Sequence, residues 1–352
     1  MPSYRTGRVS EILAEREGLQ RILVEFAPSF PGASTSRERA YVLTRLTGEV
    51  SVGDRVVVNT TAVELGLGTG GWHVVHWNLE RDSWSEPGPG HIMKLRYTSL
   101  QADTGAAEEH SDELDENLSE TPVLVCGLHS QVATVTALSA HSRPESTIAY
   151  VMTDGAALPL AMSDLVYELR RRKFLAGTIT CGHAFGGDLE AVSAWSALAL
   201  ARHRLGASLI VVGMGPGIVG TGTRLGTTGL EVAGLIDAVA GLGGTPIAVV
   251  RASSGDPRER HRGVSHHTLT ALDLARSRAI VPVPPELDPS SCGEWPEAVV
   301  RRHQFVVVDP PDPETTLDAL DLRVTTMGRG PGEDRLFFRC AAAAASVAVG
   351  ML

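Results

Sequence analysis

The chain has 352 residues, a length that exceeds what one hydrophobic core normally serves and so predicts two domains. Its hydrophobic content of 43% is typical of a folded protein. It contains no apolar run of about 18 residues and its N-terminal stretch is polar, so we expect neither a membrane span nor a secretion signal. The four cysteines lie far apart without a CxxC pair, which argues against a disulfide scaffold or a zinc ribbon and predicts a cytoplasmic protein.

The net charge of −10 is concentrated in one short segment. Eight carboxylates fall within residues 103–120, which contain no lysine or arginine, so the rest of the chain carries a net charge of only −2. The folded parts are nearly neutral, so the acidic balance says little about partners, and we do not expect a nucleic-acid partner. Lysine occurs only at Lys94 and Lys173, a bias that is typical of GC-rich actinobacteria.

Residues 1–102 are expected to form a small all-β barrel domain of the SH3 or OB kind. Short runs of strand-forming residues are separated by turn signals such as Gly53-Asp54. The expected strands span residues 7–12, 20–26, 40–46, 54–59, 72–78 and 91–97.

Residues 103–120 are expected to form a flexible acidic linker. A block of like charges that offers only Leu114 and Leu118 as apolar surface cannot bury enough area to become ordered. Limited proteolysis would then cut the chain first within this segment.

From residue 121 to residue 352 strands and helices alternate, which is typical of an α/β domain. The short strands are apolar throughout, and this pattern indicates burial on both faces of a sheet. The sequence therefore predicts a Rossmann-like domain, with a mostly parallel sheet and helices on both of its faces. The expected strands span residues 123–126, 148–152, 178–181, 209–212, 246–250, 280–283 and 305–308, and the expected helices span residues 158–173, 189–205, 230–242 and 268–277.

The loops that follow these strands carry most of the reactive side chains of the domain. Parallel strands deliver their following loops to one edge of the sheet, where open α/β sheets bind their ligands. We therefore expect one cleft at this edge, lined by His129, Asp154, His183, Gly215 and His266.

The loop after the expected strand 209–212 is rich in glycine, which predicts a close approach of backbone N–H groups to an anion. Gly215-Pro-Gly-Ile-Val-Gly220 has the GxGxxG spacing, but Pro216 lacks an N–H and Arg251 stands where a ribose-binding carboxylate should follow the next strand. Thr223 and Arg224 stand where a Walker A loop has its Lys-Ser/Thr pair, which excludes a Walker A loop. The alternative to an anion-binding loop is a plain glycine-rich turn. The anion-binding candidates are Gly213, Gly215, Gly217, Gly220, Thr221, Gly222 and Thr223.

Three histidines share the loop between residues 251 and 268. Ser265 is the expected N-cap of a helix, which places His266 and His267 in the first turn. The helix dipole there lowers the pKa of an imidazole and keeps it neutral, as a general base or a metal ligand requires. The candidate catalytic residues are His261, His266, His267, Asp154 and His183.

The arginines of the same loop alternate along the chain. In an extended backbone Arg258, Arg260 and Arg262 would face one side and clamp an anion. The alternative is a polar surface loop whose charges pair with one another.

A divalent metal is one candidate cofactor, although the sequence does not identify any cofactor. His183, Asp188 and His266 offer mixed nitrogen and oxygen ligands. No tight spacing such as HExxH accompanies them, and Asp188 could instead cap a helix.

Six stretches of the chain are similar to one bacterial family: residues 68–72, 90–96, 152–160, 180–188, 213–223 and 260–272. They resemble a DUF3866-like domain of unknown function, of an actinobacterial type, over nearly the whole chain. This resemblance implies no activity, substrate or catalytic residue, so the functional hypothesis depends on the residues themselves.

These residues favour an enzyme that acts on a small anionic, phosphorylated molecule by hydrolysis or group transfer at the carboxyl ends of the parallel strands. The first alternative is a dinucleotide-dependent oxidoreductase, which the absent ribose carboxylate weakens. The second is a non-catalytic ligand-binding sensor whose barrel and acidic segment engage a protein. A homo-oligomer is compatible with each of the three.

Overall fold

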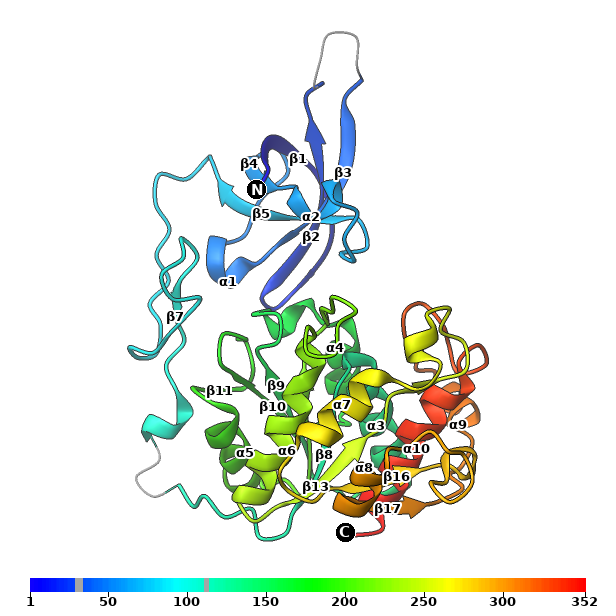
Figure 1. Ribbon diagram of the computed structural model, residues 1–352. Helices are drawn as coiled ribbons and strands as arrows, with labels where there is room; N and C mark the ends of the chain where they lie inside the picture. The colour runs from blue at the N-terminus through cyan, green and yellow to red at the C-terminus, as the bar shows by residue number, and fades with distance from the viewer. Residues whose placement is uncertain (29–33, 111–113) are drawn as a thin grey trace. The chain divides into compact units, whose positions relative to one another are not determined.

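The computed structural model describes residues 1–28, 34–110 and 114–352, which divide into two compact units, Met1–Thr104 and Gly105–Leu352. The first unit is a small closed barrel and the second is a Rossmann-like α/β domain (Figure 1). Both parts of the predicted fold class are confirmed.

Five strands close the barrel in the order β1-β2-β3-β5-β4. Only β3 and β5 pair in parallel, and the other neighbours are antiparallel. Alternate side chains, such as Ile22, Val24 and Phe26, point inward and are fully buried, as the polar-apolar alternation of a barrel strand requires. The strands are β1 (Tyr4–Arg16), β2 (Leu19–Phe26), β3 (Ser36–Val42), β4 (Arg55–Asn59) and β5 (Trp72–Asn78), with the short helices α1 (Thr44–Thr47) and α2 (Thr61–Glu64) between them.

The expected strand 91–97 does not continue the barrel. Its only strand residues, β6 (Met93–Lys94), pair with β7 (Ala102–Asp103) in a separate two-stranded ribbon. Leu95 and Tyr97 have φ angles of 52° and 62°, so the backbone leaves the extended conformation there.

Most of the acidic segment belongs to the second unit, which begins at Gly105, and it packs against the rest of that unit, in contrast to the unpacked linker expected from its charge. Leu118 is fully buried, and its N–H donates to the carbonyl of Leu242 at 2.8 Å. Glu108 lies in the short helix η1 (Ala107–His110). Its carboxylate accepts hydrogen bonds from the Val192 N–H and the Ser196 hydroxyl, both at 2.8 Å. Specific contacts offset the repulsion between like charges at these positions. Asp112 and Glu113 of the predicted linker lie outside the described residues.

All eight strands of the central sheet are parallel, in the order β11-β10-β9-β12-β8-β13-β16-β17. The carboxyl ends of its strands therefore share one edge, as expected. The strands are β8 (Pro122–Cys126), β9 (Ile148–Thr153), β10 (Gly177–Cys181), β11 (Leu189–Ala191), β12 (Leu209–Met214), β13 (Thr245–Val249), β16 (Ile280–Val283) and β17 (Gln304–Val307).

Helices cover both faces of this sheet (Figure 1). Val123 and Val125 of β8 pack into the core on one face, whereas Leu124 and Cys126 pack into the core on the other. The first face is covered by α5 (Ala194–His203), α6 (Glu231–Gly241), α7 (His266–Leu274) and α8 (Glu297–Arg302), and the second by α3 (His129–Ser142), α4 (Asp164–Arg171), α9 (Pro313–Ala319) and α10 (Arg335–Val349).

Short elements decorate the edge loops of the domain. β14 (Ala252–Ser253) and β15 (Gly263–Val264) form a hairpin in the loop after β13, with η4 (Glu259–His261) at its tip. The remaining short helices are η2 (Leu160–Met162), η3 (Thr228–Leu230) and η5 (Pro285–Leu287). Among the described residues, every helix is too short or too polar to cross a bilayer.

Candidate functional site

The loops after β9, β12 and β13 meet at the carboxyl edge of the sheet. A Cβ added to Gly217 would lie 3.3 Å from the Ala156 side chain, in the loop after β9. A Cβ added to Gly220 would lie 3.5 Å from Cε1 of His267, and one added to Gly222 would lie 3.8 Å from Cζ of Arg260. The glycine-rich loop therefore contacts the loop that carries the histidines and arginines.

Three histidines form a compact cluster beside the glycine-rich loop. The ring centroids of His266 and His267 are 4.2 Å apart, and His261 lies 5.0 and 4.8 Å from them. The hydroxyl of Ser265 accepts a hydrogen bond from the His267 N–H, so Ser265 is the N-cap of α7 and its two histidines occupy the first turn. The turn η4 brings in the third ring, and His261 is 1% exposed.

The surroundings keep all three imidazoles neutral. Burial, together with the Arg251 guanidinium, lowers the pKa of His261 to about 3. Burial and the neighbouring His266 lower the pKa of His267 to about 4, and burial and Arg260 lower the pKa of His266. The direction is the one expected from the helix dipole, but the main cause is the loss of solvent around the rings.

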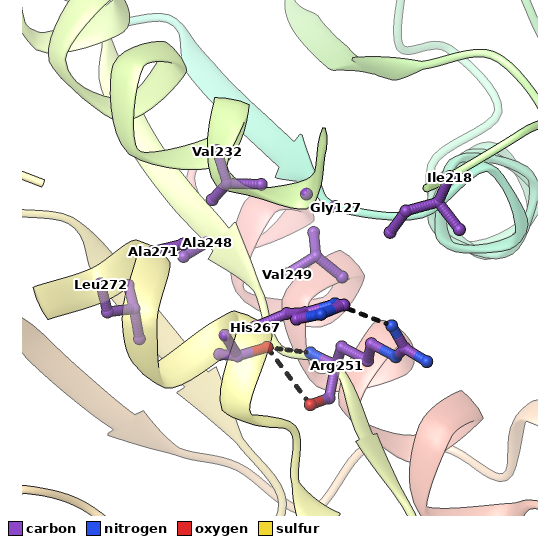
Figure 2. Close-up of a pocket in the computed structure, with 11 residues that line it drawn as sticks. Gly127, Ile218, Val232, Ala248, Val249, Arg251, His267, Ala271 and Leu272 are labelled. Atoms are coloured by element: carbon purple, nitrogen blue, oxygen red, sulfur yellow. Dashed lines mark hydrogen bonds between the residues drawn. The ribbon is translucent and has the colours of Figure 1, made fainter. Parts of the chain in front are cut away.

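Hydrogen bonds define which ring nitrogens are available. The Arg251 guanidinium donates to Nδ1 of His267 at 3.2 Å (Figure 2). In the neutral His267 ring the proton is therefore on Nε2. Nδ1 of His261 lies 2.8 Å from the Ser265 hydroxyl oxygen. Nε2 of His266 is buried and has no hydrogen-bond partner among the described residues. An orphaned buried nitrogen costs free energy unless a ligand satisfies it, which marks His266 as a functional candidate.

The expected clamp of three arginines does not form. The loop turns at η4 instead of staying extended, and Arg258 makes a bidentate ion pair with Asp256, with N–O distances of 2.9 and 2.8 Å. Its charge is therefore neutralised within the fold. Arg260 and Arg262 are exposed, and neither side chain has a hydrogen bond or ion pair to any other described residue.

An ion-pair network behind the cluster fixes the loop in place. Asp256, 1% exposed, also pairs with Arg329 at 3.4 Å and with Arg251 at 3.9 Å. Asp334 at the start of α10 accepts hydrogen bonds from the Ser253 hydroxyl at 2.6 Å and from Arg329 at 3.1 Å. This network leaves no local pattern in the sequence, because directly bonded members such as Ser253 and Asp334 lie 81 residues apart. The only local signal is that Asp334 precedes a helix, as an N-cap does.

A small pocket lies between α6, α7 and the ends of β8 and β13 (Figure 2). Gly127, Val249 and the His267 ring contribute to its largely apolar wall, beside Arg251 and Ile218. Its volume of about 20 Å³ accommodates one water molecule. A larger ligand would therefore bind on the outer side of the cluster, where residues 220–225 are exposed.

The candidate glycines divide into two groups by their surroundings. Gly213 and Gly215 are buried, and a Cβ there would approach the Cys126 carbonyl oxygen to 2.5 Å and the Met152 sulfur to 3.0 Å. Close packing therefore explains these two glycines without a ligand.

The outer part of the loop is a hairpin with free donors. Thr221 N–H donates to the Gly226 carbonyl at 2.7 Å, and the Thr221 and Thr223 hydroxyls bond to each other at 2.9 Å. The N–H groups of Gly220 and Gly222 have no acceptor within the described part of the chain. They are the backbone donors that this loop offers to an anion.

A second polar group surrounds Asp154 at the same edge. The Asp154 carboxylate accepts the His183 N–H at 2.8 Å, while the Thr153 hydroxyl lies 2.8 and 2.9 Å from the two carboxylate oxygens of Glu231. Burial, with a smaller contribution from Asp154, raises the pKa of Glu231 to about 7. Glu231 has no distinguishing signal in the sequence, because an acidic residue in the first turn of a helix is common.

His129 has a structural environment. Its Nδ1 lies 3.3 Å from the Met214 carbonyl oxygen and its Nε2 lies 2.6 Å from the Ser163 hydroxyl. Burial lowers the pKa of His129 to about 4. Both ring nitrogens are therefore occupied.

The metal set proposed from the sequence is not assembled. The Asp188 carboxylate accepts a hydrogen bond from Thr178 and pairs with Arg170 near the beginning of β10. Asp188 directly precedes β11, and because β11 runs parallel to β10, the chain has to return to the beginning of β10 at this point. His183 follows the carboxyl end of β10. The group of metal-ligating side chains that the described residues bring within 4.8 Å of one another is His261, His266 and His267.

Comparisons with known proteins identify the family of the chain. Neither the curated proteins nor the solved structures contain a match. A family model described as a protein of unknown function (DUF3866) matches residues 39–345, which include the histidine cluster, the glycine-rich loop and, in the barrel, β4, β5 and the end of β3. The chain therefore belongs to the DUF3866 family.

Proposed function

We propose that the carboxyl edge of the sheet binds a small phosphorylated molecule between the glycine-rich loop and the start of α7, and that the protein hydrolyses it or transfers its phosphoryl group. The observation that carries this proposal is the contact of three elements. The Arg260 guanidinium and a loop with two N–H donors, none of them bonded to a described residue, both adjoin three clustered imidazoles.

The electrostatics of the edge support an anionic ligand. Arg251 is 8% exposed, and burial lowers its pKa to about 10, so it stays protonated at neutral pH. Arg260 adds a second positive charge that no carboxylate among the described residues offsets. Backbone N–H groups and guanidinium groups together are the donors that proteins use for phosphate.

Neutral imidazoles next to a bound phosphate ester are suited to proton transfer. In the hydrolytic reaction a water oxygen forms a bond to phosphorus while an imidazole takes the water proton, and the P–O bond to the alcohol breaks. The alkoxide leaving group then recovers the proton from the imidazolium, which gives phosphate and an alcohol. Arginine and N–H donors stabilise the charge on the phosphoryl oxygens during this step.

The two alternatives have less support. In a dinucleotide site the glycine motif opens a helix directly, whereas here a hairpin and η3 separate Gly220 from α6. A ligand sensor requires the same binding site but no proton acceptor, so the orphaned His266 nitrogen favours the enzyme. We further propose that the protein acts in the cytoplasm, where its four free cysteines stay reduced.

Isothermal titration with methyl phosphate tests the binding part of the proposal. We expect Arg260→Ala to weaken binding about 10- to 100-fold, because a charge-assisted hydrogen bond contributes about 1.5–3 kcal/mol. The matched control is Arg278→Ala, which removes the same exposed charge just before β16, at the amino edge of the sheet.

Equal affinities of the two variants for methyl phosphate would show that binding depends only on the net charge of the protein. The assignment of the site to the carboxyl edge would then be wrong, whatever the affinity of the unmodified protein. Binding without turnover of phosphate esters would favour the sensor over the enzyme.

A further inference from the structure

The histidine cluster has the composition of a metal site. His261, His266 and His267 each offer a ring nitrogen, and these atoms all lie within 4.8 Å of one another. In a tetrahedral zinc site with Zn–N bonds of about 2.0–2.1 Å the ligand atoms lie about 3.4 Å apart. Small rotations of rings that already contact one another would close this difference.

We propose that His261, His266 and His267 bind one divalent transition-metal ion of the Zn²⁺ class. Three imidazoles are a recurrent ligand set of catalytic zinc, which keeps its fourth position open for water or substrate. Carboxylate-preferring ions such as Mg²⁺ and Ca²⁺ do not suit an all-nitrogen set. The buried His266 Nε2, which has no partner among the described residues, gains one as a ligand.

The residues around the cluster provide the support that metal-bound histidines require. The Ser265 hydroxyl contacts Nδ1 of His261, and a hydrogen bond to the second nitrogen orients a metal-bound ring. If His267 binds through Nε2, its Nδ1 takes the proton and can no longer accept from Arg251. Asp256, 3.9 Å from Arg251, is the alternative partner toward which that guanidinium can turn.

Charge couples this metal to the anion of the proposed function. Three neutral ligands leave a charge of +2 beside Arg251 and Arg260, so an anion in the open position stabilises the metal, and the metal in turn stabilises the anion. The inference thus rests on the proposed function for its substrate class, a phosphate monoester. A bound zinc ion would lower the pKa of its water to about 7, so that the attacking water could lose its proton to solvent while the imidazoles act as ligands and not as the base. The alkoxide leaving group would then take its proton from solvent.

Metal titration of the full chain tests the inference. We expect Zn²⁺ to bind in a 1:1 ratio by isothermal titration calorimetry, and Co²⁺ to give the visible spectrum of a tetrahedral site. His266→Gln should weaken the binding of either ion at least 100-fold, whereas His141→Gln, which alters an exposed histidine at the end of α3, should not. Nitrogen-15 chemical shifts of the histidine rings in the unmodified protein give a second readout that does not depend on the folding of a variant.

Methyl phosphate separates this inference from the proposed function. We expect it to raise the affinity for Zn²⁺ at least tenfold, and Zn²⁺ to raise its affinity by the same factor. Failure of the chain to bind Zn²⁺ and Co²⁺, or binding that His266→Gln leaves unchanged, would overturn the metal site. Binding of methyl phosphate that depends on Arg260 would then leave the proposed function intact.

Discussion

Replacement of Ser265 by alanine removes one hydroxyl with two roles. The Ser265 oxygen caps α7 by accepting the His267 N–H at 3.3 Å, and it also contacts Nδ1 of His261 at 2.8 Å. Loss of an N-cap costs about 1 kcal/mol, and a buried polar atom left without its partner costs about 1–3 kcal/mol. Since Ser265 and His261 are both buried, we expect a total of about 2–4 kcal/mol.

Urea unfolding followed by far-ultraviolet circular dichroism measures this cost. The helical signal reports the second unit, because α1 and α2, the α-helices in the described part of the first unit, have only four residues each. Ser193→Ala is the control, since Ser193 caps α5 through a hydrogen bond of the same 3.3 Å length without a histidine partner. We expect this variant to lose only about 1 kcal/mol. A cost for Ser265→Ala no larger than that of the control would refute the role of Ser265 in holding His261.

Three further predictions concern charge and packing. Arg258→Ala should lower the melting temperature, because it leaves the buried Asp256 with weaker partners, whereas Arg260→Ala should leave the melting temperature of the unliganded protein unchanged. Equal losses of melting temperature in differential scanning calorimetry would contradict the assignment of Arg258, and not Arg260, as the ion-pair partner of Asp256. Glu231→Gln should stabilise the protein at about pH 8 and not at about pH 4. Because the pKa of Glu231 is raised to about 7 in the folded protein, the stability that the protonated carboxyl contributes is lost as the pH rises through that value. If the variant changed the urea midpoint equally at both pH values, the raised pKa of Glu231 would be contradicted. Leu118→Ala should cost about 2–4 kcal/mol in urea unfolding, and a neutral effect would restore the interpretation of its segment as an unpacked linker.

The layer architecture was predictable because burial leaves a direct pattern in the sequence. Strands such as β8 and β12 are apolar on both faces, and only a sheet covered on both sides buries such strands. Ser265 was also readable as a cap, because an N-cap signal is local to its helix. The convergence of the edge loops followed from the direction of the strands alone.

The pairing of charges could not be read from the chain. Arg258 and Arg260 are the same residue type two positions apart, yet the turn η4 directs one to Asp256 and leaves the other exposed. Asp188 looked like a ligand near His183, but the return of the chain to the beginning of β11 takes it away from the edge. The high charge density around Leu118 predicts an unpacked segment, but the buried Leu118 side chain and its backbone hydrogen bonds hold the segment against the domain despite the repulsion between neighbouring carboxylates.

Hydrogen–deuterium exchange with and without methyl phosphate is the most direct test of the central claim, that the carboxyl edge binds an anion. The N–H groups of Gly220 and Gly222 are unbonded to described residues and should exchange rapidly until phosphate oxygens accept from them. We predict slower exchange in residues 219–228 and 258–268 with ligand, and unchanged exchange in residues 276–279 at the amino edge. Protection at the amino edge alone, or bound ligand without protection in either loop, would contradict the account.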